Sequence, residues 1–218
     1  MDDVRSQYAA RSGAHAAAST ATLLGQVMFL VALAIGFMAL GTYIGRDLAI
    51  GTARILSFAG FGMLLVAAFV PRLRVGPIAI AWLYATALMI GLGLGPIIAY
   101  FAENQPSTIT QAAGGTALTV LAMGSLGFAL SKDLAPWMRP LSIAVFACVI
   151  VGIGAMLFTS SVSPILSVII YVLSAALITV DFNYLRKHGT ADDAVWLATG
   201  IFVSIVNIFL SLLNLFGD

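Results

Sequence analysis

Residues 194–216, AVWLATGIFVSIVNIFLSLLNLF, form an apolar stretch in which polar or very small residues recur at intervals of three and four. These positions are Gly200, Ser204, Asn207, Ser211 and Asn214. Because an α-helix turns about 100° per residue, this spacing places all five on one narrow face. The stretch therefore predicts a membrane-spanning helix with one polar face, which we call the C-terminal stripe.

The preceding apolar stretch, residues 164–181, repeats this pattern. Its polar positions are Ser167, Tyr171, Ser174 and Asp181, again on one helical face. Polar groups inside hydrocarbon need partners or water, so the two stripes are expected to face each other or a wet cavity. We therefore expect the functional region to lie between these two helices.

The composition indicates an integral membrane protein. Of the 218 residues 61% are hydrophobic and only 9% are charged, which excludes a soluble domain of ordinary make-up. The formal net charge of +1 argues against nucleic acid as a partner. The single cysteine, Cys148, excludes an intramolecular disulfide and is expected to be a small core residue.

Seven apolar stretches are each long enough to cross a hydrocarbon core of about 30 Å. The expected spans are residues 22–44, 49–70, 76–101, 110–130, 140–158, 164–181 and 194–216. The sequence thus predicts an all-α, polytopic, seven-helix bundle as one membrane domain, residues 22–218. Residues 1–21 are expected to form a retained, polar and unstructured cytoplasmic tail.

The distribution of cations predicts the orientation. Eight of the ten Lys and Arg residues fall on the side of the N-terminus, and only Arg46 and Arg54 fall on the other. The eight are Arg5, Arg11, Arg72, Arg74, Lys132, Arg139, Arg186 and Lys187. The positive-inside rule therefore places the N-terminus in the cytoplasm and the C-terminus on the outer side of the membrane.

Glycines and prolines in the spans suggest how the helices pack. Gly91 and Gly95 form a small-xxx-small pair, which is typical of close helix contact. We expect the same role for four glycines of the fourth span, Gly114, Gly115, Gly124 and Gly127. Pro96 and Pro164 lie near helix ends, and a broken helix at either one is an open alternative.

The inventory of reactive residues argues against an enzyme. His15 and His188 are the only histidines, and both lie outside the expected spans. A serine–histidine protease or a histidine-ligated metal centre therefore cannot form within the bilayer. Lys132 and Lys187 lie in loops, so a retinal Schiff base in the last helix is excluded. We expect neither a cofactor nor a metal.

Four motifs resemble the Bax inhibitor-1 family. Residues 199–218, TGIFVSIVNIFLSLLNLFGD, are similar to its C-terminal signature, with an Asn-Ile-Phe-Leu core and a Leu-Phe-Gly stop. LGLGPIIAYF at 92–101, GGTAL at 114–118 and SKDL at 131–134 resemble the bacterial YccA-like branch. The resemblance implies a seven-helix inner-membrane protein that binds and modulates the membrane AAA+ protease FtsH. Other members of the family behave as pH-sensitive calcium leak pathways.

The resemblance also implies candidate site residues. The calcium-leak members use one aspartate on each of the last two helices and an arginine from the second. The first aspartate corresponds to Asp181 in VDFNYLRK and the arginine to Arg72 in FVPRLR. The second aspartate corresponds to Ser204, since Asn207 fills the family's asparagine position. One carboxylate facing a serine cannot share a proton as a carboxylate pair does, so pH-gated calcium flux is not expected.

Two functions follow as hypotheses. The first is a partner or slow substrate of a membrane protease that uses the N-terminal tail as its handle. The second is an ion path, for calcium or another cation, along the two polar stripes. A continuous cavity reaching Ser204 would favour the path, and a closed core would favour the regulator. Asp181 is either functional or part of a structural ion pair, and Asn207 and Asn214 are expected to bond across helices.

Overall fold

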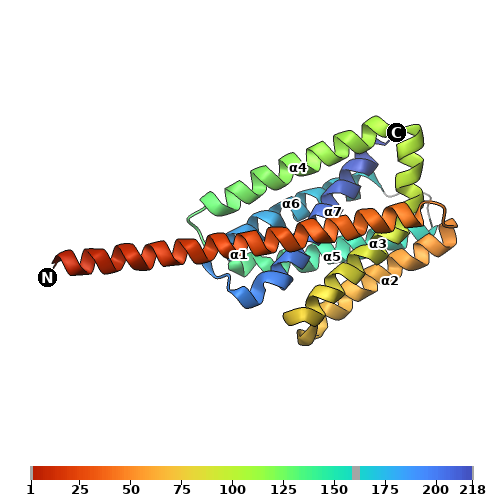
Figure 1. Ribbon diagram of the computed structural model, residues 1–218. Helices are drawn as coiled ribbons and strands as arrows, with labels where there is room; N and C mark the ends of the chain where they lie inside the picture. Colours follow the sequence, from red (N-terminus) through yellow and green to blue (C-terminus); the bar gives the residue numbers. More distant parts are fainter. Residues whose placement is uncertain (1, 159–162, 218) are drawn as a thin grey trace.

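Seven long helices make up the bundle (Figure 1). The structure, a computed structural model, describes residues 2–158 and 163–217. The long helices are α1 (Asp2–Gly45), α2 (Ile50–Phe69), α3 (Gly76–Asn104), α4 (Pro106–Ala129), α5 (Ala135–Phe158), α6 (Pro164–Lys187) and α7 (Ala194–Phe216), with short 3₁₀ helices η1 (Pro71–Leu73) and η2 (Ala191–Asp193). In the described part of the chain all seven contain a stretch apolar and long enough to cross a membrane. The predicted all-α, seven-helix fold class is confirmed.

The N-terminal segment departs from the expectation of an unstructured tail. Helix α1 begins at Asp2, whereas its apolar, membrane-crossing part begins only at Ser19. Figure 1 shows the first turns of α1 projecting well beyond the rest of the bundle as a continuous helix. The segment is rich in alanine and adjoins a span that is already helical, so it extends a helix without the cost of nucleating one. We call residues 2–18 the N-terminal extension.

After α1, helices α5 and α6 extend furthest beyond the spans that the sequence predicts. Helix α5 begins at Ala135 and includes Pro140, because the carboxylate of Asp133 accepts the N–H of Ala135 and so caps an earlier start. Helix α6 continues past Asp181 to Lys187, because its polar residues beyond that point have hydrogen-bond partners at the end of α4 and in the loop that follows.

The prolines do not break their helices. Pro164 occupies the first turn of α6, where its missing N–H has no helical partner to lose. Helix α3 continues from Gly76 through Pro96 to Asn104. Figure 1 shows the last part of α3 turning away from its earlier direction before α4 begins, which is the kink expected of an internal proline.

Helices α1 and α3 meet through two pairs of glycines. A Cβ atom added to Gly41 or Gly45 of α1 would collide with the backbone of α3 at Leu88 or Leu92. One added to Gly91 or Gly95 of α3 would collide with the backbone of α1. The predicted small-xxx-small contact at Gly91 and Gly95 is confirmed, with a matching pair on α1 that was not predicted.

The glycines of α4 differ among themselves. A Cβ at Gly115 would lie 2.9 Å from Leu212 Cδ1, and one at Gly124 would lie 3.3 Å from the ring of Phe182. Gly127 is closed in by the backbone of α6. A Cβ at Gly114, in contrast, would meet no atom within 4 Å, so the expected close contact is wrong at this position.

Candidate functional site

The polar stripes of α6 and α7 face each other, as the sequence predicts. Near one end of the helix pair, Asn214 Nδ2 of α7 donates to Ser167 Oγ of α6 at 2.9 Å. Towards the other end, a Cβ added to Gly200 of α7 would lie 3.4 Å from Asp181 Oδ2 of α6. The two contacts set an antiparallel register in which Ser174 lies level with Asn207. Tyr171 is an exception, because its hydroxyl pairs with Thr119 Oγ1 of α4 at 2.9 Å.

The middle of this interface buries polar atoms without partners. Ser174 and Ser204 are fully buried, and Asp181 and Asn207 are each 4% exposed. Within the described residues, Ser174 Oγ, Asp181 Oδ2, Ser204 Oγ and Asn207 Nδ2 have no hydrogen-bond partner. A buried polar atom without a partner costs about 1–3 kcal/mol, so four of them at one helix interface call for a physical reason. The expected bond from Asn207 to the neighbouring helix is therefore not formed through its amide nitrogen.

One cavity of about 200 Å³ lies beside Asp181. It is bordered by α2, α5, α6, α7 and the segment after η1, and Asp181 and Gly200 form part of its wall. We call it the Asp181 cavity. Its other polar side chains include Arg74, Ser142 and Thr199.

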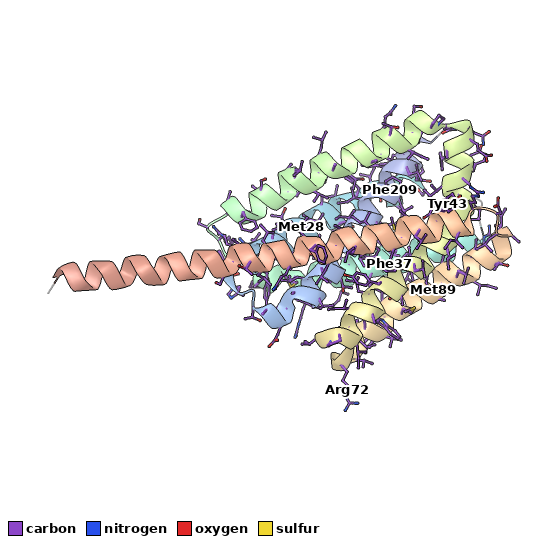
Figure 2. The ribbon with its side chains drawn as sticks, viewed as in Figure 1. Met28, Phe37, Tyr43, Arg72, Met89 and Phe209 are labelled. Atoms are coloured by element: carbon purple, nitrogen blue, oxygen red, sulfur yellow. The ribbon has the colours of Figure 1, made fainter. Side chains whose placement is uncertain are left out.

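Arg72 does not lie near Asp181. It is exposed, and Figure 2 shows its side chain pointing away from the bundle. Arg74 borders the Asp181 cavity instead, and its guanidinium donates to the carbonyls of Ala67 and Ala68 near the end of α2. The 3₁₀ turn of η1 sends these two arginines in different directions, and Arg74 satisfies carbonyls that the end of α2 leaves unpaired. No ion pair joins Asp181 to an arginine within residues 19–152 and 163–217.

A second cavity of about 460 Å³ lies further along α7. Its walls come from α2, α3, α5, α6 and α7, and they include Asn207, Ser211 and Asn214 of the C-terminal stripe together with Ser167. Arg54 of α2 also borders it. We call it the Asn207 cavity.

Ser204 separates the two cavities. Val203 borders the Asp181 cavity and Asn207 borders the Asn207 cavity, whereas Ser204 borders neither and is fully buried. The C-terminal stripe is therefore split: Gly200 belongs to the first cavity, and Asn207, Ser211 and Asn214 belong to the second. Among the described residues, the C-terminal stripe therefore does not line one continuous cavity past Ser204.

Asn183 is a buried polar residue whose role the sequence did not reveal. It is fully buried, and its Nδ2 lies 3.1–3.2 Å from the carbonyls of Gly127, Leu130 and Lys132. The only sequence signal is an asparagine two residues beyond Asp181, at a position where the apolar span was expected to have ended. The loop that it binds could not be matched to it without the tertiary structure.

An exposed pair lies beside this loop. Asp133 Oδ2 is 2.8 Å from His188 Nε2, and Asp133 Oδ1 accepts the N–H of Ala135 at 3.0 Å. The Ala135 N–H and then the hydrogen bond with His188 lower the pKa of the Asp133 carboxyl below its usual value. The pair links the start of α5 to the end of α6.

Comparison with known proteins gives a family and two similar proteins. The sequence profile of the family described as "Inhibitor of apoptosis-promoting Bax1" matches residues 20–218, which leaves the N-terminal extension outside the match. The chain is 26% identical over 204 residues to the Escherichia coli K12 protein named "Modulator of FtsH protease YccA", covering 91% of both chains. "Inner membrane protein YccA" of Escherichia coli O6:H1 matches with the same identity and coverage. Neither the family description nor these names denote an enzyme.

Proposed function

Because this chain belongs to the Bax inhibitor-1 family, we propose that it is an inner-membrane regulatory protein that binds and modulates an FtsH-type protease. The observation that carries the proposal is its similarity, over 91% of both chains, to a protein named as a modulator of FtsH protease. The cation bias of the sequence supports, as part of this proposal, a cytoplasmic N-terminal extension and a periplasmic C-terminus.

The N-terminal extension supplies the part that a protease would engage. It projects beyond the bundle as the start of α1, and it lies outside the part of the chain that matches the family profile. A projecting chain end can be held by a cytoplasmic enzyme without any change in the membrane domain. Binding at this end therefore leaves the seven-helix bundle intact.

The packing of α1 explains how binding would become modulation. A pull on the N-terminal extension acts directly on α1, whose spanning part is held against α3 by Gly41, Gly45, Gly91 and Gly95. The two backbones touch at this contact, so a movement of side chains cannot loosen it. Extraction of α1 would therefore be slow. The protease would remain bound to this chain, and the degradation of its other substrates would be slowed.

The experiment uses the purified chain reconstituted with an FtsH-type protease and a membrane substrate. The full chain is expected to slow degradation of the substrate, and a variant lacking residues 2–18 is expected to lose this effect. Both proteins should melt at the same temperature, because the deletion removes no part of the bundle. A shortened protein that still protects the substrate would contradict the role of the extension.

The alternative function is an ion path along α6 and α7. It is favoured by Asp181, a buried carboxylate that borders a cavity and has an unpartnered oxygen. The closure at Ser204 opposes it, because an ion would have to cross a fully buried level between the two cavities. Calcium entry into vesicles holding the purified chain should stay close to that of empty vesicles at acidic and alkaline pH. Fast, steeply pH-dependent entry would put the ion path first.

A further inference from the structure

The Asn207 cavity is large, mainly apolar and accessible from the side of the bundle. Its volume of about 460 Å³ falls within the range of about 300–1,000 Å³ that is usual for small-molecule sites. Part of its wall is exposed: Ile50, Phe58, Ile97 and Tyr100 all border the cavity and also reach the bundle surface. Because these residues belong to helices that cross the membrane, the cavity opens where lipid chains lie.

One end of the cavity carries a positive charge. Arg54, in the second turn of α2, is exposed at its border, near the end of the bundle where α1 ends and α2 begins. No carboxylate borders the cavity in the part of the chain that the structure describes. The carboxylate of Asp47, in the loop before α2, is paired with Arg46 at 3.2 Å. Arg54 is thus a cation at the mouth of an apolar cavity that supplies no counter-ion.

A second polar group lies deeper in the cavity. Asn207 is 4% exposed, it borders the cavity, and its Nδ2 has no partner among the described residues. An unpaired amide donor in apolar surroundings favours a ligand that carries a hydrogen-bond acceptor. Tyr100 adds an exposed ring near the same end as Arg54, where aromatic side chains meet lipid headgroups.

We propose that the Asn207 cavity binds one anionic phospholipid of the surrounding bilayer, with its phosphate on Arg54, an ester carbonyl near Asn207 and one acyl chain along the apolar wall. A cation at the mouth, an amide donor inside and an apolar wall match the three parts of such a lipid. The site is separate from the N-terminal extension and from the Asp181 cavity.

The test is native mass spectrometry of the full chain in detergent with equal amounts of phosphatidylglycerol and phosphatidylcholine. One phosphatidylglycerol should be retained in preference to phosphatidylcholine. Arg54→Gln should lower that preference about fivefold, the effect of one cation near an anionic lipid. The matched control is Arg46→Gln, since Arg46 is an exposed arginine at the same end that stacks on Tyr43 outside the cavity. It should leave the preference unchanged.

A third variant tests the acyl-chain part of the site. Val149→Trp, at the α5 wall, should reduce retention of both lipids by filling the cavity, and Leu210→Trp fills it from α7 if the first variant does not fold. An unchanged preference in Arg54→Gln, or an equal loss in Arg46→Gln, would overturn the proposal. Displacement of phosphatidylglycerol by inorganic phosphate would show that Arg54 binds free anions, and this would overturn the lipid assignment.

Discussion

The backbone N–H of Leu134 donates to Oδ1 of Asn183 at 2.9 Å, and this bond joins the loop between α4 and α5 to the core of the bundle. The Nδ2 of the same asparagine donates to the carbonyl of Gly127 in the last turn of α4 and to the loop carbonyls of Leu130 and Lys132. Arg186 and Lys187, on the next turn of α6, donate to the carbonyls of Leu130 and Ser131. The end of α6 therefore supplies hydrogen bonds that the loop cannot make for itself.

Replacing Asn183 should destabilise the protein strongly. Asn183→Leu removes the partners of several buried backbone groups, and each buried group left unpaired costs about 1–3 kcal/mol. We expect a clear drop in the melting temperature of the purified protein in detergent. Asn104→Leu is the control, because Asn104 is exposed and bonds only within its own helix, to Tyr100 O at 2.8 Å among the contacts described. An equal drop in both variants would argue against the role of Asn183.

Replacing a glycine by alanine should destabilise the protein only where the glycine touches a neighbouring helix, as at the contact between α1 and α3. Gly91→Ala puts a methyl group against the backbone of α1 at Met38 and should lower the melting temperature. Gly114→Ala meets no atom within 4 Å and should leave the melting temperature unchanged or raise it slightly, because alanine favours a helix by about 0.5–1 kcal/mol over glycine. Similar behaviour of the two alanine variants would contradict the packing of α1 on α3.

The spans and the facing stripes could be predicted because they depend on local information. The length of an apolar stretch and the 100° turn per residue suffice to place Ser167, Asp181 and Asn214 on inward faces. Helix ends were less predictable. The extra turns of α5 and α6 depend on hydrogen bonds with the loop between α4 and α5. In one of these bonds, Leu134 of the loop and Asn183 of α6 are 49 residues apart in the sequence.

The site itself was only partly predictable. Sequence spacing cannot show that Ser204 lies between two cavities, because their walls come from α2, α3, α5, α6 and α7, which are distant in the sequence. The resemblance pointed to Arg72 near Asp181, whereas Arg74 borders the Asp181 cavity, and the sequence could not show this because the direction of each side chain depends on the short η1 turn. The prediction of an unstructured tail was wrong. It rested on composition and did not consider that the adjoining span is already helical, so that the helix can extend into the tail.

The hydrogen bonds that Asp133 makes with the Ala135 N–H and with His188 should make stability depend on pH. The folded protein holds the pKa of Asp133 below its value in the unfolded chain, so the carboxylate stabilises the fold above that unfolded value, about 3.9. This stabilisation is lost as the pH falls through the lowered pKa. The difference in melting temperature between the native protein and Asp133→Asn should therefore shrink towards strongly acidic pH. Glu103→Gln, a change at an exposed carboxylate, should produce no comparable trend.

The two asparagines of the C-terminal stripe should respond in opposite ways to the same substitution. Asn214→Leu removes the donor to Ser167 Oγ and leaves that buried hydroxyl without its bond, so stability should fall by about 1 kcal/mol. Asn207→Leu removes an amide whose Nδ2 has no partner within the described chain, so stability in lipid-free detergent should stay the same or rise. Both substitutions add the same side chain to the same face of α7, so their comparison cancels the change in helix propensity and in apolar volume. The measurement is the melting temperature of each purified variant. A loss at Asn207 as large as that at Asn214 would mean that the Asn207 amide is paired in the folded protein, and the Asn207 cavity would then lack its inner donor.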